Sequence, residues 1–151
     1  TGWRIGYAGG PARLIGAMKN VQSQSTSNAT SIAQAAAVVA LNGDQQCVRD
    51  MCVQFEKRAK HVVDGLNAIP GVECLMPDGT FYCFPRVTGA MEARGIADDL
   101  EFSRRLLDDV GVALVPGSAF GLDGHVRISF ATSMDVLDQA IERIGRFSRG
   151  G

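Results

Sequence analysis

One arginine stands where a strand could aim a positive charge at an anion. In the segment HVRISFA, apolar residues alternate with Arg127 and Ser129, which is the period of a half-buried strand. The segment follows the glycine-rich stretch PGSAFGLDG, which offers backbone N–H groups and one aromatic side chain, Phe120. A guanidinium on a strand can grip a carboxylate or a phosphate through two parallel hydrogen bonds. Arg127 is therefore a candidate anion-binding residue; the alternative is a strand arginine that faces solvent or pairs with a glutamate.

Arg4 has a similar setting near the beginning of the sequence. Trp3, Ile5 and Tyr7 alternate with Arg4 and small residues, which predicts a short strand over residues 3–8. The small residues beside Arg4 leave room for a bulky anion. A purely structural role explains this arginine equally well.

Other catalytic groups are poor candidates. His61 and His125 have no serine or cysteine partner that the sequence identifies, so we interpret them as surface or boundary histidines. Lys19, Lys57 and Lys60 lie in helical, solvated contexts. None of these amines has the desolvated setting that a Schiff base requires.

Composition narrows the classes of partner. The net charge is -1, from 15 basic and 16 acidic residues without a block of like charge, so we expect neither nucleic acid nor a membrane surface as a partner. No apolar run approaches the roughly 20 residues of a membrane span. The four cysteines form no C-x-x-C pair, which favours reduced thiols, a cytoplasmic location and no metal site.

The first part of the chain has the spacing of helices. Leu14, Met18 and Val21 recur at helical intervals up to the polar stretch SQSTSN, which we expect to form a loop and a cap. The stretch TSIAQAAAVVAL is apolar on nearly all sides. It predicts a second helix that is buried on most of its surface and ends near Gly43.

The rest of the chain mixes helices with short strands. Asp44 is expected to cap a long helix that runs to about residue 68 and carries one apolar stripe, which includes Val48 and Met51. Pro77-Asp78-Gly79 predicts a turn between strands in VECLM and TFYCFPRV. The later predicted elements are a helix with Leu100, Ser103, Leu106, Leu107 and Val110 inward, strands in VALVP and HVRISFA, and a last helix that is capped at residues 132–135 and has Val136 inward.

These elements divide the chain into two unequal parts. Residues 1–43 are helical and apolar, whereas residues 44–151 read as a unit with its own core. The fold class is α/β, with an α+β second part in which a mixed or antiparallel sheet packs against helices.

Several segments together resemble the class I aminotransferases of the aspartate aminotransferase type, which are pyridoxal-phosphate enzymes of fold type I. TGWRIGYAGGP is similar to the stretch after the cofactor lysine, and QSQSTSNATSIAQ to the active-site loop and helix that follow it. PDGTFYCFP resembles the start of the small domain's sheet, and VPGSAFG with HVRISFA resembles the region that binds the substrate carboxylate. These segments occur in the family's order over residues 1–131.

The resemblance implies that the chain is the C-terminal portion of a larger enzyme. Residues 1–43 would be the tail of the large cofactor-binding domain, and residues 44–151 the long linking helix and the small domain. The lysine that binds pyridoxal phosphate is expected just before Thr1, so this chain contains no catalytic residue of its own. We therefore expect the chain alone to be inactive.

The resemblance also implies roles for individual residues. Arg4 would grip the cofactor phosphate, Arg127 the α-carboxylate of the substrate, and Phe120 would line the substrate cleft. The loop at residues 25–28 would approach the active site of a partner subunit. Ala29 departs from the pattern, because many relatives carry proline there.

The implied function is the transfer of an amino group from an amino acid, of aspartate type, to a 2-oxo acid by a homodimer. Two alternatives stay open. The chain could be part of another fold type I enzyme, such as a lyase or a synthase, or a non-catalytic domain of aminotransferase type that senses a ligand or mediates dimerisation.

Overall fold

The computed structural model describes residues 2–150, and Thr1 and Gly151 lie outside the described residues. The chain divides into two compact units, Thr1–Cys47 and Val48–Gly151. The change of unit falls near the boundary that the sequence suggests. The assignment of the two parts to a large and a small domain stays a prediction.

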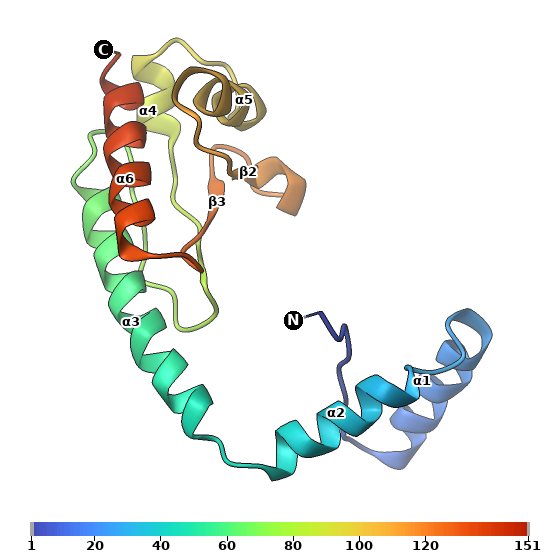
Figure 1. Cartoon of the computed structure of the whole chain (residues 1–151). Coiled ribbons are helices and arrows are strands. Elements are labelled where there is room, and N and C mark those ends of the chain that lie inside the picture. The colour runs from blue at the N-terminus through green and yellow to red at the C-terminus, as the bar shows by residue number, and fades with distance from the viewer. Residues whose placement is uncertain (1, 151) are drawn as a thin grey trace. The chain divides into compact units, whose positions relative to one another are not determined.

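The first unit consists of two helices, α1 (Ala12–Ser25) and α2 (Ser31–Asn42) (Figure 1). The Thr30 side chain caps α2 by accepting a hydrogen bond from the backbone N–H of Ala33 at 3.3 Å. Both predicted helices are confirmed. The expected loop begins later than the sequence suggested, because α1 extends to Ser25.

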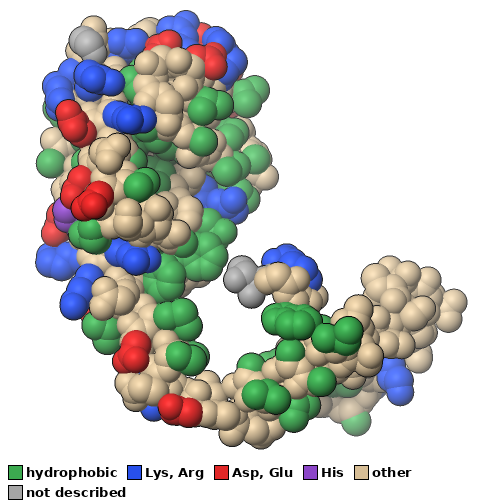
Figure 2. Space-filling model, viewed as in Figure 1, with side chains coloured by type: hydrophobic (Ala, Val, Ile, Leu, Met, Phe, Trp, Pro, Cys, Tyr) green, Lys and Arg blue, Asp and Glu red, His purple; other side chains and the backbone are tan. Residues whose placement is uncertain are grey.

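Two expectations for the first unit are wrong. Residues 3–8 form no strand, because a strand needs a neighbouring strand to pair with and no described residue of this unit is in one. Burial of α2 on most sides is also wrong: only Ala33 is buried, and Val39 is 73% exposed. Figure 2 shows the apolar side chains of the segment that holds α2 at the surface.

The second unit is a small antiparallel sheet with helices packed against it, which confirms the α/β class. The sheet has the strand order β1-β3-β2, and both pairings are antiparallel. No helix of the described residues is both long and apolar enough to cross a membrane. The elements are α3 (Gln46–Asn67), β1 (Tyr82–Cys83), α4 (Thr88–Ala93), α5 (Asp99–Val110), β2 (Val115–Pro116), η1 (Gly117–Phe120), β3 (Val126–Ser129) and α6 (Met134–Arg149).

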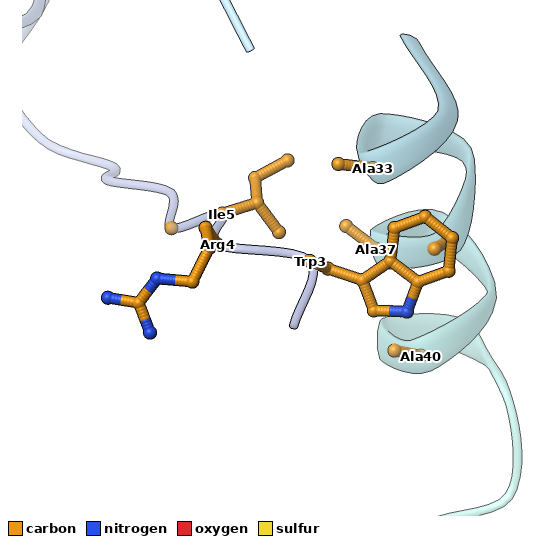
Figure 3. Close-up of a pocket in the computed structure, with 8 residues that line it drawn as sticks. Trp3, Arg4, Ile5, Ala33, Ala37 and Ala40 are labelled. Carbon is orange, nitrogen blue, oxygen red and sulfur yellow. The ribbon is translucent and has the colours of Figure 1, made fainter. Parts of the chain in front are cut away.

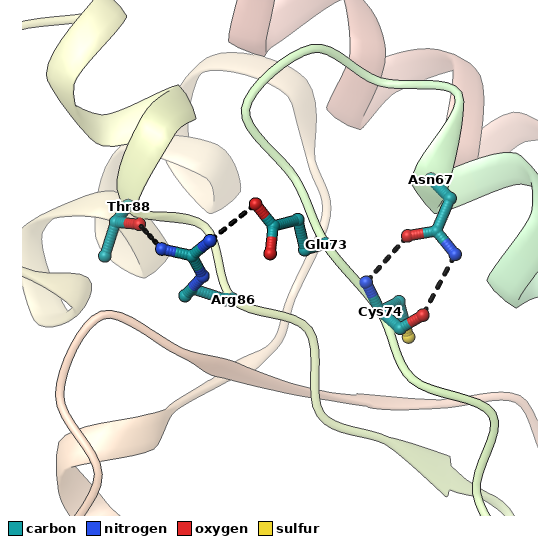
Figure 4. Close-up of polar contacts among 5 residues, drawn as sticks. All are labelled: Asn67, Glu73, Cys74, Arg86 and Thr88. Atoms are coloured by element: carbon teal, nitrogen blue, oxygen red, sulfur yellow. Dashed lines mark hydrogen bonds and ion pairs between the residues drawn. The ribbon is translucent and has the colours of Figure 1, made fainter.

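The predicted strand in VECLM is reduced to one bridge between Glu73 and Arg86. Asn67 explains this, because its side chain binds the backbone of Cys74 on both sides. Its Oδ1 accepts from the Cys74 N–H at 2.7 Å, and its Nδ2 donates to the Cys74 carbonyl at 2.9 Å (Figure 4). These two backbone groups are therefore bonded to a side chain instead of to a neighbouring strand.

Arg86 fixes the same region from the other side. Its guanidinium forms an ion pair with Glu73 and donates a hydrogen bond to Oγ1 of Thr88 at 3.3 Å (Figure 4). The ion pair holds the pKa of Glu73 below its usual value. Thr88 begins α4, a helix that the sequence patterns did not predict.

The expected caps of the long helix and the last helix are confirmed. Oδ1 of Asp44 accepts from the backbone N–H of Gln46 at 3.0 Å, and Oγ of Ser133 accepts from that of Val136 at 3.4 Å. Val136 was expected to face inward, and its side chain is instead exposed.

The core of the second unit lies where α3, α5, α6 and the sheet meet. Its largest fully buried apolar side chains are Phe102, Phe130, Leu66, Leu106, Val62, Val87 and Val126. The apolar stripe of α3 is buried only in its second half, so the expected burial of Val48 and Met51 is wrong.

The inward face of α5 also differs from the expectation. Leu100 and Leu107 were expected inward and are exposed, whereas Phe102 is buried. The face consists of Asp99, Phe102, Ser103 and Leu106, which follow the helical spacing from the first residue of the helix.

Leu106 and Leu107 provide a direct test of this core. Leu106→Ala should lower the free energy of unfolding by about 2–5 kcal/mol, because the lost atoms leave a cavity. Leu107→Ala should change it by less than about 0.5 kcal/mol, because its side chain is 51% exposed while that of Leu106 is 0% exposed. Denaturant unfolding of the protein that contains this chain measures both. Equal losses would contradict the orientation of α5.

Candidate active site

The guanidinium of Arg127 lies between two aromatic rings. Its Cζ is 4.5 Å from the ring centroid of Tyr82 and 4.6 Å from that of Phe120. Tyr82 pairs with Ser129 across the sheet, so Arg127, two residues earlier on β3, is its diagonal neighbour on the same face. Such contacts attract the cation to both rings and restrict its rotation.

The N–H donors of Arg127 are not used by an acidic side chain among the described residues. The side chain is half-buried, and among residues 2–150 no acidic side chain forms an ion pair with it. Contacts of the cation with the faces of two rings use none of the guanidinium's N–H donors. The arrangement is therefore suited to a planar anion such as a carboxylate, which can accept two parallel hydrogen bonds.

Phe120 reaches this position through a tight glycine turn. It is the last residue of η1, and η1 begins at Gly117, whose N–H donates to the His125 carbonyl at 2.7 Å. A Cβ at Gly117 would lie 2.4 Å from the carbonyl oxygen of Leu122 and 2.7 Å from that of His125. Only glycine fits at position 117. Packing therefore explains the first glycine of the stretch PGSAFGLDG.

An aromatic row continues from Phe120. Its ring meets Phe84 edge to face, with centroids 6.0 Å apart, and Phe84 stacks on the imidazole of His125 at 5.5 Å. The sequence patterns did not point to Tyr82 or Phe84. They are two residues apart in TFYCFP, which places both on one face of a strand. This spacing could have indicated that the two rings lie side by side.

Asp99 is a further polar residue that the sequence patterns did not single out. It is buried at the start of α5, and its Oδ2 accepts a hydrogen bond from the backbone N–H of Ser118 at 2.7 Å. Burial by itself raises the pKa of Asp99, but hydrogen bonds, chiefly from Ser118, outweigh it and lower the pKa overall. The buried carboxylate is therefore ionised at neutral pH.

Arg4 lies in the first unit with a backbone φ of 49°. This is the left-handed region, which is uncommon for a residue with a Cβ. A pocket of about 650 Å³ is lined by residues 3–6 and by alanines of α2. Figure 3 shows Trp3 and Ile5 toward α2, while the Arg4 guanidinium points away from the helix. No hydrogen bond or ion pair to this guanidinium occurs within residues 2–150.

The other candidate residues have contacts of their own or lie at the surface. His61 contacts Asp138 at 2.5 Å on the partly exposed surface between α3 and α6. Lys19, Lys57 and Lys60 are exposed, as predicted. The four cysteines are free, two of them buried.

Comparison with known proteins decides the family. The family profile of the class I and II aminotransferases matches residues 1–144. The chain belongs to this family. The resemblance found in the motifs is thereby confirmed.

Individual aminotransferases show the same relationship. The chain is 50% identical over 150 residues to an aspartate/prephenate aminotransferase of Nitrosomonas europaea, a match that covers 95% of this chain and 38% of the relative. It is 50% identical over 147 residues to an aspartate aminotransferase of Geobacillus stearothermophilus, covering 97% of this chain and 37% of the relative. The chain thus spans little more than a third of the length of these relatives.

Solved aminotransferase structures share the fold. The crystal structure of the aspartate aminotransferase from Rhizobium meliloti matches with a TM-score of 0.85 and 50% identity, covering 97% of this chain and 38% of that one. The enzyme from Thermotoga maritima matches with a TM-score of 0.82 and 40% identity, covering 97% and 36%. The roles of Arg4, Phe120, Arg127 and residues 25–28 are not tested by these matches and stay predictions.

The close approach of backbone carbonyls to Gly117 can be tested by substitution. Gly117→Ala should lower the free energy of unfolding by about 1–3 kcal/mol, because the added Cβ collides with two backbone carbonyls. Gly79→Ala is the matched control, since a Cβ there has nothing within 4 Å. Thermal or denaturant unfolding measures both. A Gly117→Ala variant as stable as Gly79→Ala would contradict the turn geometry.

Proposed function

We propose that the full-length protein containing this chain is an aspartate-type aminotransferase. It moves an amino group from an amino acid to a 2-oxo acid and uses pyridoxal 5'-phosphate. The observation that carries this proposal is the Arg127 guanidinium, fixed between Tyr82 and Phe120 with no acidic partner among the described residues. Relatives named aspartate aminotransferase, about half of whose residues are identical over the matched length, support it.

Arg127 binds the α-carboxylate in this proposal. Both substrate classes, amino acids and 2-oxo acids, carry a carboxylate beside the reacting carbon. A bidentate contact from Arg127 would hold this group in one plane and so orient the carbon between substrate and cofactor. Phe120 and Tyr82 keep the guanidinium in place, and Phe120 also forms part of the wall of the cleft.

Arg4 holds the cofactor phosphate in this proposal. Its guanidinium is exposed and has no acidic partner among residues 2–150, so its donor set fits a doubly charged phosphate. When bound, the cofactor supplies an electron sink for the carbon that loses its proton. Arg4 contributes charge and position to this chemistry and moves no proton.

The chain by itself is proposed to be inactive. Its lysines, at positions 19, 57 and 60, are exposed, whereas an amine that forms a Schiff base is activated by desolvation or by a neighbouring cation. We further propose a cytoplasmic homodimer, in which residues 25–28 approach the partner's site. These residues are exposed, and Ser27 has a left-handed backbone with φ of 63°.

Arg127→Ala in the full-length enzyme tests the carboxylate contact. It should raise KM for aspartate by at least about 30-fold, because losing one partner of a buried charge pair costs roughly 2–5 kcal/mol. Arg127→Lys should recover only part of this loss, because an ammonium cannot form the bidentate contact. Steady-state kinetics with both substrates measures the effect.

Arg104→Ala is the matched control. This arginine is exposed and pairs with Asp108 one turn along α5, so its loss should leave KM unchanged. An unchanged KM in Arg127→Ala would refute the proposed carboxylate contact.

A further inference from the structure

Asp99 is a buried carboxylate that binds a residue outside its own helix. Its side chain is 2% exposed, and a buried carboxylate is costly unless its oxygens accept hydrogen bonds. Asp99 is not needed to cap α5, because Asp98 caps it. Oδ1 of Asp98 accepts a hydrogen bond from the backbone N–H of Glu101 at 2.7 Å. The carboxylate of Asp99 is thus available for contacts outside its own helix.

Those contacts lie on the glycine-rich turn. Ser118, 19 residues further along the chain, donates its backbone N–H to Oδ2 of Asp99 at 2.7 Å. Ser118 is the second residue of η1, and Phe120 is its last residue. Asp99 therefore ties η1 to the beginning of α5.

The backbone of this turn also fixes the Phe120 ring, which contacts Arg127. Phe120 is 50% exposed, and its recorded ring contacts are the edge of Phe84 and the guanidinium of Arg127. With so little packing of its own, its position depends on the backbone of η1. A change at Asp99 would leave the Ser118 N–H without its acceptor and loosen η1. Arg127 would then keep its contact with the Tyr82 ring alone.

We propose that Asp99 is a positioning residue for the substrate carboxylate. It holds η1 through Ser118, so that the Phe120 ring stays against the Arg127 guanidinium and restricts its rotation. This inference rests on the proposed function, in which Arg127 binds that carboxylate.

The test uses the full-length holoenzyme with kinetics normalised to bound cofactor. Asp99→Ala should raise KM for aspartate about tenfold, because the Ser118 N–H loses its acceptor and η1 loosens, with little change in kcat. Asp98→Ala is the matched control: the carboxylate it removes accepts from the Glu101 N–H of the same helix and not from Ser118, so KM should stay at the wild-type value. A merely structural role of Asp99 would lower thermal stability and leave KM of the folded enzyme unchanged.

Asp99→Asn provides a second variant that keeps the side-chain volume. Its carbonyl oxygen can still accept from the Ser118 N–H, but a neutral acceptor binds more weakly than a carboxylate, so KM should rise about threefold. This variant retains the test if the alanine variant does not fold. An unchanged KM in the folded variants would overturn the inference.

A double-mutant cycle with Arg127 separates this inference from the proposed function. If Asp99 acts through Arg127, Asp99→Ala should add nothing to KM in the Arg127→Ala background. Equal effects of Asp99→Ala in both backgrounds would overturn the positioning role. If Arg127→Ala leaves KM unchanged, the proposed function fails. If Arg127→Ala raises KM while Asp99→Ala does not, only the role of Asp99 fails.

Discussion

A guanidinium between two aromatic rings is the arrangement on which the candidate site depends. Arg127 is attracted to the faces of Tyr82 and Phe120, and these contacts restrict it without using its hydrogen-bond donors. An ion pair to a nearby carboxylate would have fixed the side chain equally well, but it would have occupied the donors. The rings therefore hold the charge in place and leave it able to bind an acid.

Each ring is supplied by a different part of the second unit. Tyr82 comes from β1, and the antiparallel register with β3 places it beside Arg127. Phe120 comes from η1, whose backbone is fixed by Gly117 and by the carboxylate of Asp99. The core formed by residues of α3, α5 and α6 also includes Cys83 of β1 and Val126 of β3. The site thus depends on long-range packing as much as on its own residues.

The sequence predicted those features that arise from local patterns. The alternation around Arg127 and the cap at Ser133 need only neighbouring residues, and both are found. The strand at residues 3–8 failed because pairing requires a second strand. The contact that Asp99 makes could not be found from a periodic pattern, since its partner lies 19 residues away and is a backbone group. The ring of Tyr82 required the register between strands, which the sequence does not specify.

The central claim is that Arg127, clamped by its two rings, binds the substrate carboxylate. A crystal structure of the full-length enzyme with a bound amino acid or 2-oxo acid tests it most directly. We predict two hydrogen bonds of about 2.7–2.9 Å from the guanidinium to the carboxylate oxygens, with Tyr82 and Phe120 still in contact with it. A carboxylate bound elsewhere, or Arg127 turned away to pair with an acidic side chain of the protein, would contradict it.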